Sequence, residues 1–384
     1  MKQLGPVEPG VQNAVPSATA STVEENELPP LGTLQNLDEF ETTARKVVSR
    51  KAWVYFSSAT DTLASYKKNR LDWSKVTLRP RVLRNVGRIT MKRTIMGHDS
   101  DLPFFIAPAA QARLGHEDGE LCLARGAARY NIPYCSSTYT SVAHKELADC
   151  MKAEQKGGAL LYQLYVPVNK PNAKYLVADA VKLGYKALVL TVDSAVIGKR
   201  EEDDRYKAEL DYDAVVVIER SLSTEGDVPI VRGSHSSTLE WNDLSWIREA
   251  WGNIGPVILK GIQTAEDAAM AAEAGVHGIY LSNHGGRQMD YAPSSLQTLL
   301  EIRKFYPDLI NKLEIYLDGG VTRGSDVLKA IALGARAVGI GRPFMYALSG
   351  YGTEGVCRAI ERTYSNPRTA TFILGEANNL LSLE

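Results

Sequence analysis

Eight short apolar segments, separated nearly everywhere by helical patterns, constrain the fold of this chain more than any other feature. The segments are near-continuous in hydrophobic residues, which is typical of parallel strands buried on both faces. We expect strands at residues 104–107, 134–136, 159–164, 187–192, 257–259, 278–281, 314–317 and 337–340. Helical spacing predicts helices at residues 117–130, 142–153, 173–183, 265–274, 294–305 and 325–333, with a last helix from about Glu354.

Eight such alternations predict an α/β protein, a closed (β/α)8 barrel of the TIM type, with an N-terminal helical segment and a long loop after the fourth strand. An open, doubly wound sheet is the alternative. The barrel is favoured because no GxGxxG motif follows the first strand. In addition, polar residues follow all eight strands, at the end where barrel enzymes build their sites.

The segments outside this alternation divide the chain. Residues 1–30 are rich in Pro, Ser, Thr, Val and Glu without periodicity and are expected to form a disordered linker or tail. Residues 31–384 are expected to form one domain. A helix is predicted over residues 36–54, with Asp38 as its cap, and residues 78–81 are expected to be extended because of Pro80. The connection at residues 201–242 is long enough for a lid or an unstructured loop.

Composition excludes several classes of function. Charged residues make up 23% of the chain and the net charge is −1, so no broad attraction to nucleic acid or anionic membrane is expected. No apolar run reaches the roughly 20 residues of a membrane helix. The four cysteines form no CxxC pair and are expected to be reduced and structural, and no metal site is predicted. We expect a cytoplasmic protein, or a mitochondrial one if a presequence is missing.

The segment LSNHGGRQMD, at residues 281–290, follows one predicted strand directly. A rigid strand end would hold an acid/base group, His284, and a cation, Arg287, about one turn apart. The two glycines between them allow a ligand to approach the backbone. This segment is therefore the predicted catalytic centre.

Glycine-rich segments at residues 318–324 and 339–343 follow the seventh and eighth strands, where barrels commonly bind phosphate. Lys260 ends the fifth strand and would lie inside the mouth of the barrel. A lysine in that place can form a Schiff base, as in an aldolase, or supply charge to an electron-rich ring. The residues alone leave both possibilities open.

The motif SNHGGRQ, together with TVD and GKRE at residues 191–201, DGG at 318–320 and GRP at 341–343, resembles the FMN-dependent L-2-hydroxy-acid dehydrogenase/oxidase family. The similarity runs from about Pro30 to the C-terminus and is greatest to the flavin domain of haem-fused L-lactate dehydrogenases. Glycolate oxidase, lactate oxidase and mandelate dehydrogenase are other members. Residues 1–30 would then correspond to a hinge, which favours a dehydrogenase.

The resemblance implies oxidation of an L-2-hydroxy acid to the 2-oxo acid, with FMN as cofactor and oxygen, a cytochrome or a quinone as electron acceptor. It also implies a homotetramer. His284 would be the base, taking a proton from the alpha carbon or from the hydroxyl, and Asp193 would orient it and stabilise its imidazolium. The substrate would be held by four further side chains, of which the first two clamp its carboxylate: Arg200, Arg287, Tyr55 and Tyr165.

The same resemblance assigns the cofactor site. Lys260 would face the ring of FMN and stabilise negative charge on it. The other ring contacts would be Pro108, Ala109, Ala110, Ser137, Gln163 and Thr191, with Ser282 also at the cofactor. The ribityl chain and phosphate would be bound by Asp318, Gly319, Gly320, Arg323, Gly341 and Arg342.

Some positions depart from the family pattern. Thr322 stands where the family has the first of two arginines, and Ala59 replaces a usual glycine. Tyr139 falls where members carry tryptophan or leucine and is expected to line the pocket for the substrate side chain. We therefore expect a lactate-like substrate or a bulkier analogue. The alternatives from other classes are a Schiff-base phosphosugar enzyme that uses Lys260, and a barrel that binds a ligand without catalysis.

Overall fold

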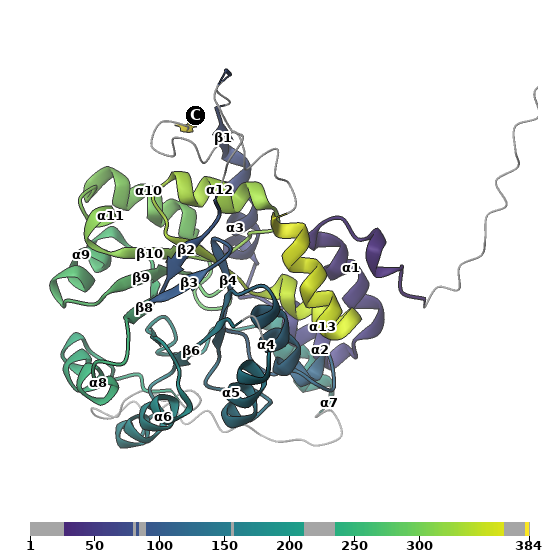
Figure 1. Ribbon diagram of the computed structural model, residues 1–384, viewed down its shortest axis with the longest axis horizontal. Coiled ribbons are helices and arrows are strands. Elements are labelled where there is room, and N and C mark those ends of the chain that lie inside the picture. The colour runs from purple at the N-terminus through teal and green to yellow at the C-terminus, as the bar shows by residue number, and fades with distance from the viewer. Residues whose placement is uncertain are drawn as a thin grey trace, which may run out of the picture.

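The computed structural model describes residues 27–79, 82–83, 90–154, 157–210, 235–364 and 381–383. Eight parallel strands form a closed barrel in the order β10-β11-β4-β5-β6-β7-β8-β9 (Figure 1). They are β4 (Phe104–Ile106), β5 (Pro133–Ser136), β6 (Ala159–Leu164), β7 (Leu188–Thr191), β8 (Val257–Ile262), β9 (Gly278–Leu281), β10 (Glu314–Leu317) and β11 (Ala337–Ile340). The predicted barrel is confirmed, and the open sheet is wrong because β11 pairs with β4 and closes the ring.

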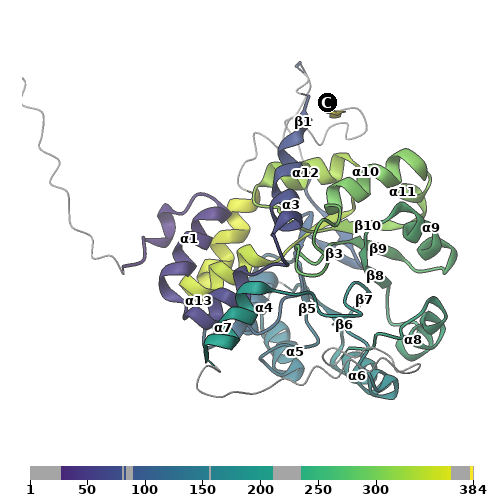
Figure 2. The same cartoon turned by 180° about the vertical axis from the view of Figure 1, so that it is seen from behind.

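Helices follow the strands and cover the outside of the barrel (Figures 1 and 2). They are α4 (Glu120–Arg129), α5 (His144–Ala153), α6 (Lys170–Leu183), α8 (Leu244–Trp251), α9 (Ala265–Glu273), α10 (Ser295–Phe305), α11 (Leu309–Lys312), α12 (Gly324–Ala332) and α13 (Arg342–Tyr364). Their apolar faces pack against the strands and form the larger of two hydrophobic cores.

The second core fills the barrel itself, where Phe105 packs edge to face against Tyr280 and Tyr316. A hairpin of β2 (Arg93–Ile95) and β3 (His98–Ser100) closes the end opposite the strands' carboxyl termini. Its turn residue Met96 is fully buried and donates its backbone N–H to the hydroxyl of Tyr316, 2.9 Å away. One end of the barrel is therefore sealed, and a ligand has to enter at the other.

The N-terminal segment differs from its prediction. Instead of one helix over residues 36–54, there are two, α1 (Leu37–Val47) and α2 (Arg50–Ser57). Val48 is extended between them, and the Ser49 side chain accepts a hydrogen bond from the backbone of Ala52 and so starts a new helix. The cap of α1 is Asn36 rather than Asp38, because the Asn36 side chain accepts from the first free N–H groups. Tyr55 consequently lies within α2 instead of beyond the helix.

A further helix, α3 (Ala64–Lys75), follows where irregular structure was expected. It crosses the mouth of the barrel and is bonded to the segment after β9. The side chains of Asn69 and Asn283 exchange two hydrogen bonds, of 2.8 and 2.7 Å. Asp290 accepts the backbone N–H groups of Thr62 and Ser65. The LSNHGGRQMD segment thus holds α3 in place by hydrogen bonds and also contains the predicted catalytic groups.

Contact between α3 and the loop after β10 requires glycine at position 320. Gly320 has φ +75°, and a Cβ there would lie 2.2 Å from the backbone oxygen of Asn69. We expect Gly320→Ala to lower the free energy of unfolding by about 1–3 kcal/mol, the usual cost of a strained left-handed residue. Thermal unfolding measures this. The matched control is Gly341→Ala, whose Cβ would meet only Ala107, at 3.9 Å; an equal loss of stability in both variants would contradict the argument.

Four more predictions were incomplete. The predicted loop at residues 201–242 begins with a helix, α7 (Glu201–Leu210), and its residues 211–234 lie outside the described residues. Helix α8 was not predicted. The last helix begins at Arg342 instead of about Glu354, with a break at Tyr351 and Gly352. Of the stretch predicted to be extended, 78–81, only Leu78 lies in a strand, β1 (Val76–Leu78), which pairs with β12 (Leu381–Leu383). Pro80 and Arg81, like residues 1–26 of the predicted tail, are outside the described residues.

All four cysteines are free thiols, and Cys122, Cys135 and Cys357 are buried, as predicted. Within the described ranges, no helix is long and apolar enough to cross a membrane.

Candidate active site

A cavity of about 790 Å³ opens at the carboxyl ends of the barrel strands. Most of the predicted site residues line it, although they come from all eight strands and from α2. They are Tyr55, Pro108, Ala109, Ala110, Ser137, Tyr139, Gln163, Tyr165, Thr191, Arg200, Lys260, His284, Arg287, Asp318, Gly319, Gly320, Gly341 and Arg342. Three predicted residues, Asp193, Ser282 and Arg323, do not line it.

His284 lies between a carboxylate and a phenol. Its Nδ1 is 2.8 Å from Oδ1 of Asp193, and its Nε2 is 3.2 Å from the hydroxyl of Tyr165. Because an ionised carboxylate can only accept, Nδ1 carries the hydrogen and Nε2 presents its lone pair to the cavity. The geometry therefore provides a base at Nε2 with a hydroxyl group beside it.

The backbone of His284 is left-handed, with φ +59°. Its N–H donates to the side chain of Ser282, 3.0 Å away, and this bond helps to hold the unusual conformation. Ser282 is fully buried below the cavity and donates in turn to Asp318, at 2.8 Å. Ser282 thus fixes the floor of the site instead of facing a ligand directly.

The charge states follow from burial and neighbours. Burial opposes ionisation of Asp193, but His284 and Lys260 hold the pKa of this carboxyl below its ordinary value. Burial lowers the pKa of His284 from 6.5, against the opposing effect of Asp193. Burial also raises the pKa of Tyr165, so its hydroxyl stays protonated. At neutral pH the site holds an unprotonated base, a carboxylate and a hydroxyl donor.

These directions predict the pH dependence of the reaction. The base acts only when unprotonated, so activity should be present above the pKa of His284 and lost as the pH falls through it. Since that pKa lies below 6.5, we expect kcat/KM to be flat near neutrality and to fall only in more acidic buffer. A pH profile of kcat/KM measures this, and an acidic limb centred above pH 6.5 would contradict it.

Three arginines converge on one side of the cavity. Burial, with Arg200 and Arg342 nearby, lowers the pKa of Arg287 to about 9. Arg287 is held by two carbonyl groups, those of Tyr55 and Ser58, each 2.9 Å from its Nη1, and its guanidinium lies over the Tyr55 ring. The buried Nε of Arg200 has no hydrogen-bond partner among the described residues. Uncompensated cations of this kind favour binding of an anion.

Lys260 is 3% exposed and lies at the end of the cavity nearest the barrel core. Its ammonium donates to Ser282 at 3.2 Å and lies 3.7 Å from Oδ2 of Asp193 and over the ring of Tyr280. A Schiff base would need the lysine nitrogen free to attack a carbonyl, whereas here it is engaged by Ser282 and lies beside the buried Asp193 carboxylate. The site geometry therefore favours the role of a fixed positive charge.

The cavity also fits a flat, electron-rich cofactor with a phosphate. Its walls include small residues at 108–110 and 319–320, and a side chain at Gly341 would enter open space with only Ala107 within 4 Å. Gln163 is held by Thr138 and Thr191, which fixes the polar face that it presents. FMN would be held by these residues, with Lys260 at its ring.

The phosphate end differs from the expectation. Arg323 does not line the cavity and pairs with Asp38, 2.6 Å away, whereas Thr322 lines it. Arg342 lines the cavity but donates to the carbonyl groups of Phe56, Ser58 and Gly285. The predicted contacts of these two arginines with phosphate therefore remain predictions, and in this structure both tie segments of the protein together.

Sequence reasoning missed other lining residues. His235 lies in the cavity wall and belongs to the later part of the long connection, in a Ser/Gly-rich stretch that carries no motif. Tyr66 and Asn69 come from α3, which was not predicted because its apolar residues do not repeat at helical spacing.

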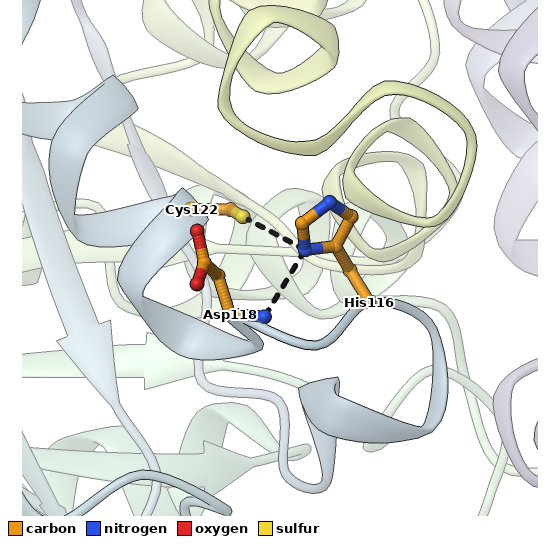
Figure 3. A group of neighbouring side chains, drawn as sticks. All are labelled: His116, Asp118 and Cys122. Atoms are coloured by element: carbon orange, nitrogen blue, oxygen red, sulfur yellow. Dashed lines mark hydrogen bonds between the residues drawn. The ribbon is translucent and has the colours of Figure 1, made fainter.

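A second group of chemically capable side chains lies outside this cavity. His116, Asp118 and Cys122 come within 4.8 Å of one another (Figure 3). However, Nδ1 of His116 accepts the backbone N–H of Asp118, and the Asp118 carboxylate is 2.7 Å from the guanidinium of Arg125. Burial raises the pKa of the Cys122 thiol to about 11. Each group already has a partner, and the cluster is explained as part of the α4 N-terminus.

A buried carboxylate–histidine pair, a group of cations and a cofactor-sized cavity lie together at the mouth of the barrel, where barrel enzymes build their active sites. The chain belongs to the FMN-dependent dehydrogenase family, whose model matches residues 44–378. Because of this membership the cofactor is FMN, and the Schiff-base alternative is wrong.

Named relatives agree with this assignment. The L-lactate dehydrogenase (cytochrome) of Wickerhamomyces anomalus is 37% identical over 87% of this chain, and 2-hydroxyacid oxidase 2 of Bos taurus is 36% identical over 88% of this chain and 94% of that one. A flavocytochrome b2 variant superposes with a TM-score of 0.82 at 33% identity, covering 93% of this chain and 89% of that one. A mandelate oxidase variant superposes with a TM-score of 0.79 at 32% identity, covering 92% of this chain and 99% of that one. The chain spans 58% and 57% of the two cytochrome-type lactate dehydrogenases that it matches.

Proposed function

We propose that this protein oxidises an L-2-hydroxy acid, lactate-like or bulkier, to the corresponding 2-oxo acid. The observation that carries the proposal is the position of His284 in one cavity with Tyr165 and Arg287, with Nδ1 bonded to the buried Asp193. The family membership and the relatives named for lactate, 2-hydroxy acid and mandelate oxidation support it.

The roles of the side chains follow from their places in the site. Arg200 and Arg287 bind the substrate carboxylate, with Tyr55 beside them, because neither arginine forms a salt bridge with an acid of the described residues. The hydroxyl of the substrate then lies near Tyr165 and Nε2 of His284.

Oxidation removes two electrons and two protons, and converts the C–OH carbon to C=O. His284 takes one of these protons, from the alpha carbon or from the hydroxyl, and Asp193 stabilises the imidazolium that results. When bound, FMN would supply the acceptor for the two electrons and the remaining proton, and the electrons would pass from it to a further acceptor. Lys260 provides a fixed positive charge at the cofactor, and Asp193 keeps Lys260 in place.

The proposal extends to the setting of the reaction. The acceptor is oxygen, a cytochrome or a quinone, and the similarity to cytochrome-type lactate dehydrogenases favours a dehydrogenase. We further propose a homotetramer in the cytoplasm, with a mitochondrial location as the alternative. Light scattering on the purified protein and localisation of a tagged chain test these two points.

Product analysis tests the reaction. The purified FMN-loaded protein is incubated with ferricyanide and either enantiomer of a 2-hydroxy acid, and the 2-oxo acid is quantified. We expect one equivalent of 2-oxo acid for every two of ferricyanide reduced, and only with the L-enantiomer. Formation of no 2-oxo acid from any L-2-hydroxy acid, by a protein that has retained FMN, would show that the barrel binds without catalysing.

A further inference from the structure

His235 forms an aromatic wall with Tyr139 and Tyr165 on one side of the cavity. The ring centroids of His235 and Tyr165 are 4.1 Å apart and the planes differ by 12°. Tyr139 is nearly parallel to both, with centroid distances of 5.4 Å to His235 and 5.7 Å to Tyr165. The three rings thus stack nearly parallel to one another in the cavity lining, and Tyr165 also contacts the catalytic His284.

Backbone pairing sets the place of His235. The residue bridges to Pro167 in antiparallel fashion, and the N–H of Ser236 donates to the carbonyl of Val166, 2.8 Å away. The later part of the long connection is therefore held by backbone pairing to the residues that directly follow Tyr165. Burial lowers the pKa of His235, so the ring is neutral at neutral pH and offers a weakly polar face.

Placing the substituents of the substrate's alpha carbon in the site shows which of them contacts this wall. The carboxylate is directed to Arg200 and Arg287, and the hydroxyl to His284 and Tyr165. The remaining large substituent, the side chain, is left facing the part of the cavity that Tyr139 and His235 line. This step rests on the proposed function, because it takes a 2-hydroxy acid as the substrate.

We infer that the wall of Tyr139, His235 and Tyr165 selects L-2-hydroxy acids with a flat, aromatic side chain over lactate and glycolate, and that His235 is a specificity-determining residue. A planar group gains contact area and favourable ring–ring geometry against parallel aromatic rings, whereas a methyl group or a hydrogen leaves their surface uncovered. Loss of one such ring partner weakens binding about threefold to tenfold.

The experiment compares two variants with the wild-type holoenzyme. His235→Ala removes the ring, and the matched control His235→Phe keeps a flat ring without its nitrogens. The ratio of kcat/KM for L-mandelate to that for L-lactate should exceed ten in the wild type, fall about fivefold or more in H235A and stay within twofold in H235F. A wild type that prefers L-lactate, or an H235A variant that loses both substrates equally, would overturn the inference.

A binding measurement gives a second readout that does not depend on turnover or on a folded variant. The dissociation constants of phenylglyoxylate and pyruvate are measured from the change in flavin absorbance of the oxidised wild-type holoenzyme. The aromatic 2-oxo acid should bind at least about tenfold more tightly; equal or weaker binding would overturn the inference. If phenylglyoxylate binds more tightly but no 2-hydroxy acid is oxidised, the role of the wall is supported and the proposed reaction is wrong. If L-lactate is oxidised in preference to L-mandelate, the reaction stands and the inference falls.

Discussion

His284→Gln should lower the rate of substrate oxidation by about three to four orders of magnitude, the upper part of the range for loss of a positioned general base. Glutamine can still donate an N–H to Asp193 or accept the hydroxyl hydrogen of Tyr165, but it cannot take up a proton near neutral pH. Because His284 sits in a pre-formed pocket with Asp193 and Tyr165, the loss should appear in kcat more than in KM. Stopped-flow absorbance of the flavin measures the step directly.

The control is a histidine at the opposite end of the barrel. His98, on the hairpin that closes the barrel, bonds to Asn131 and does not line the cavity. His98→Gln should keep the wild-type rate. If H284Q retained FMN and oxidised substrate within tenfold of the wild type, His284 would not be the base.

Asp193→Asn should have the second-largest effect, because one buried carboxylate serves two partners. Its side chain is fully buried, with Oδ1 at His284 and Oδ2 3.7 Å from Lys260. The amide cannot balance the charge of the buried ammonium, which should cost roughly 3 kcal/mol of stability. It can also present its NH₂ to Nδ1 and so turn the histidine to the wrong tautomer, with a rate loss of about 10³ to 10⁴. Thermal unfolding and rapid flavin reduction measure the two effects.

Ser194→Ala separates the effect of the Asp193 charge from the effect of a hydrogen bond to that carboxylate. The Ser194 hydroxyl donates to the same Oδ1 of Asp193, 2.8 Å away, but carries no charge. We expect a rate loss of less than about tenfold, since a neutral hydrogen bond is worth about 1 kcal/mol. Equal losses in S194A and D193N would show that the carboxylate charge is unimportant.

The barrel could be read from the sequence because its strands are short apolar runs and its helices are amphipathic, so both periodicities stand out. The N-terminal helices were harder to predict from the sequence. The break between α1 and α2 depends on the cap at Ser49 rather than on any change in apolar spacing. Helix α3 buries polar residues such as Asn69 and Asp72, which find partners only in the folded protein. No spacing of apolar residues in the sequence predicts such a helix.

The site was predictable where residues follow strands, because the barrel brings all carboxyl ends to one mouth. His284 follows β9, Asp193 follows β7 and Lys260 lies in β8. The structure places Asp193 next to both His284 and Lys260. His235 could not be foreseen, since it reaches the cavity through a backbone pairing with residues 166–167 across a long connection. The engagement of Arg323 by Asp38 likewise depends on how α1 docks, which the sequence pattern does not specify.

The measurement that tests the central claim most directly is the visible spectrum of the purified protein, made anaerobic and titrated with L-2-hydroxy acids before air is readmitted. The account predicts a flavin band that is bleached by one equivalent of a substrate, with aromatic members bleaching it fastest, and slow recovery of colour in air as in a dehydrogenase. A yellow protein that no L-2-hydroxy acid bleaches would contradict the proposed reaction, and a colourless protein that cannot be reconstituted with FMN would contradict the site itself.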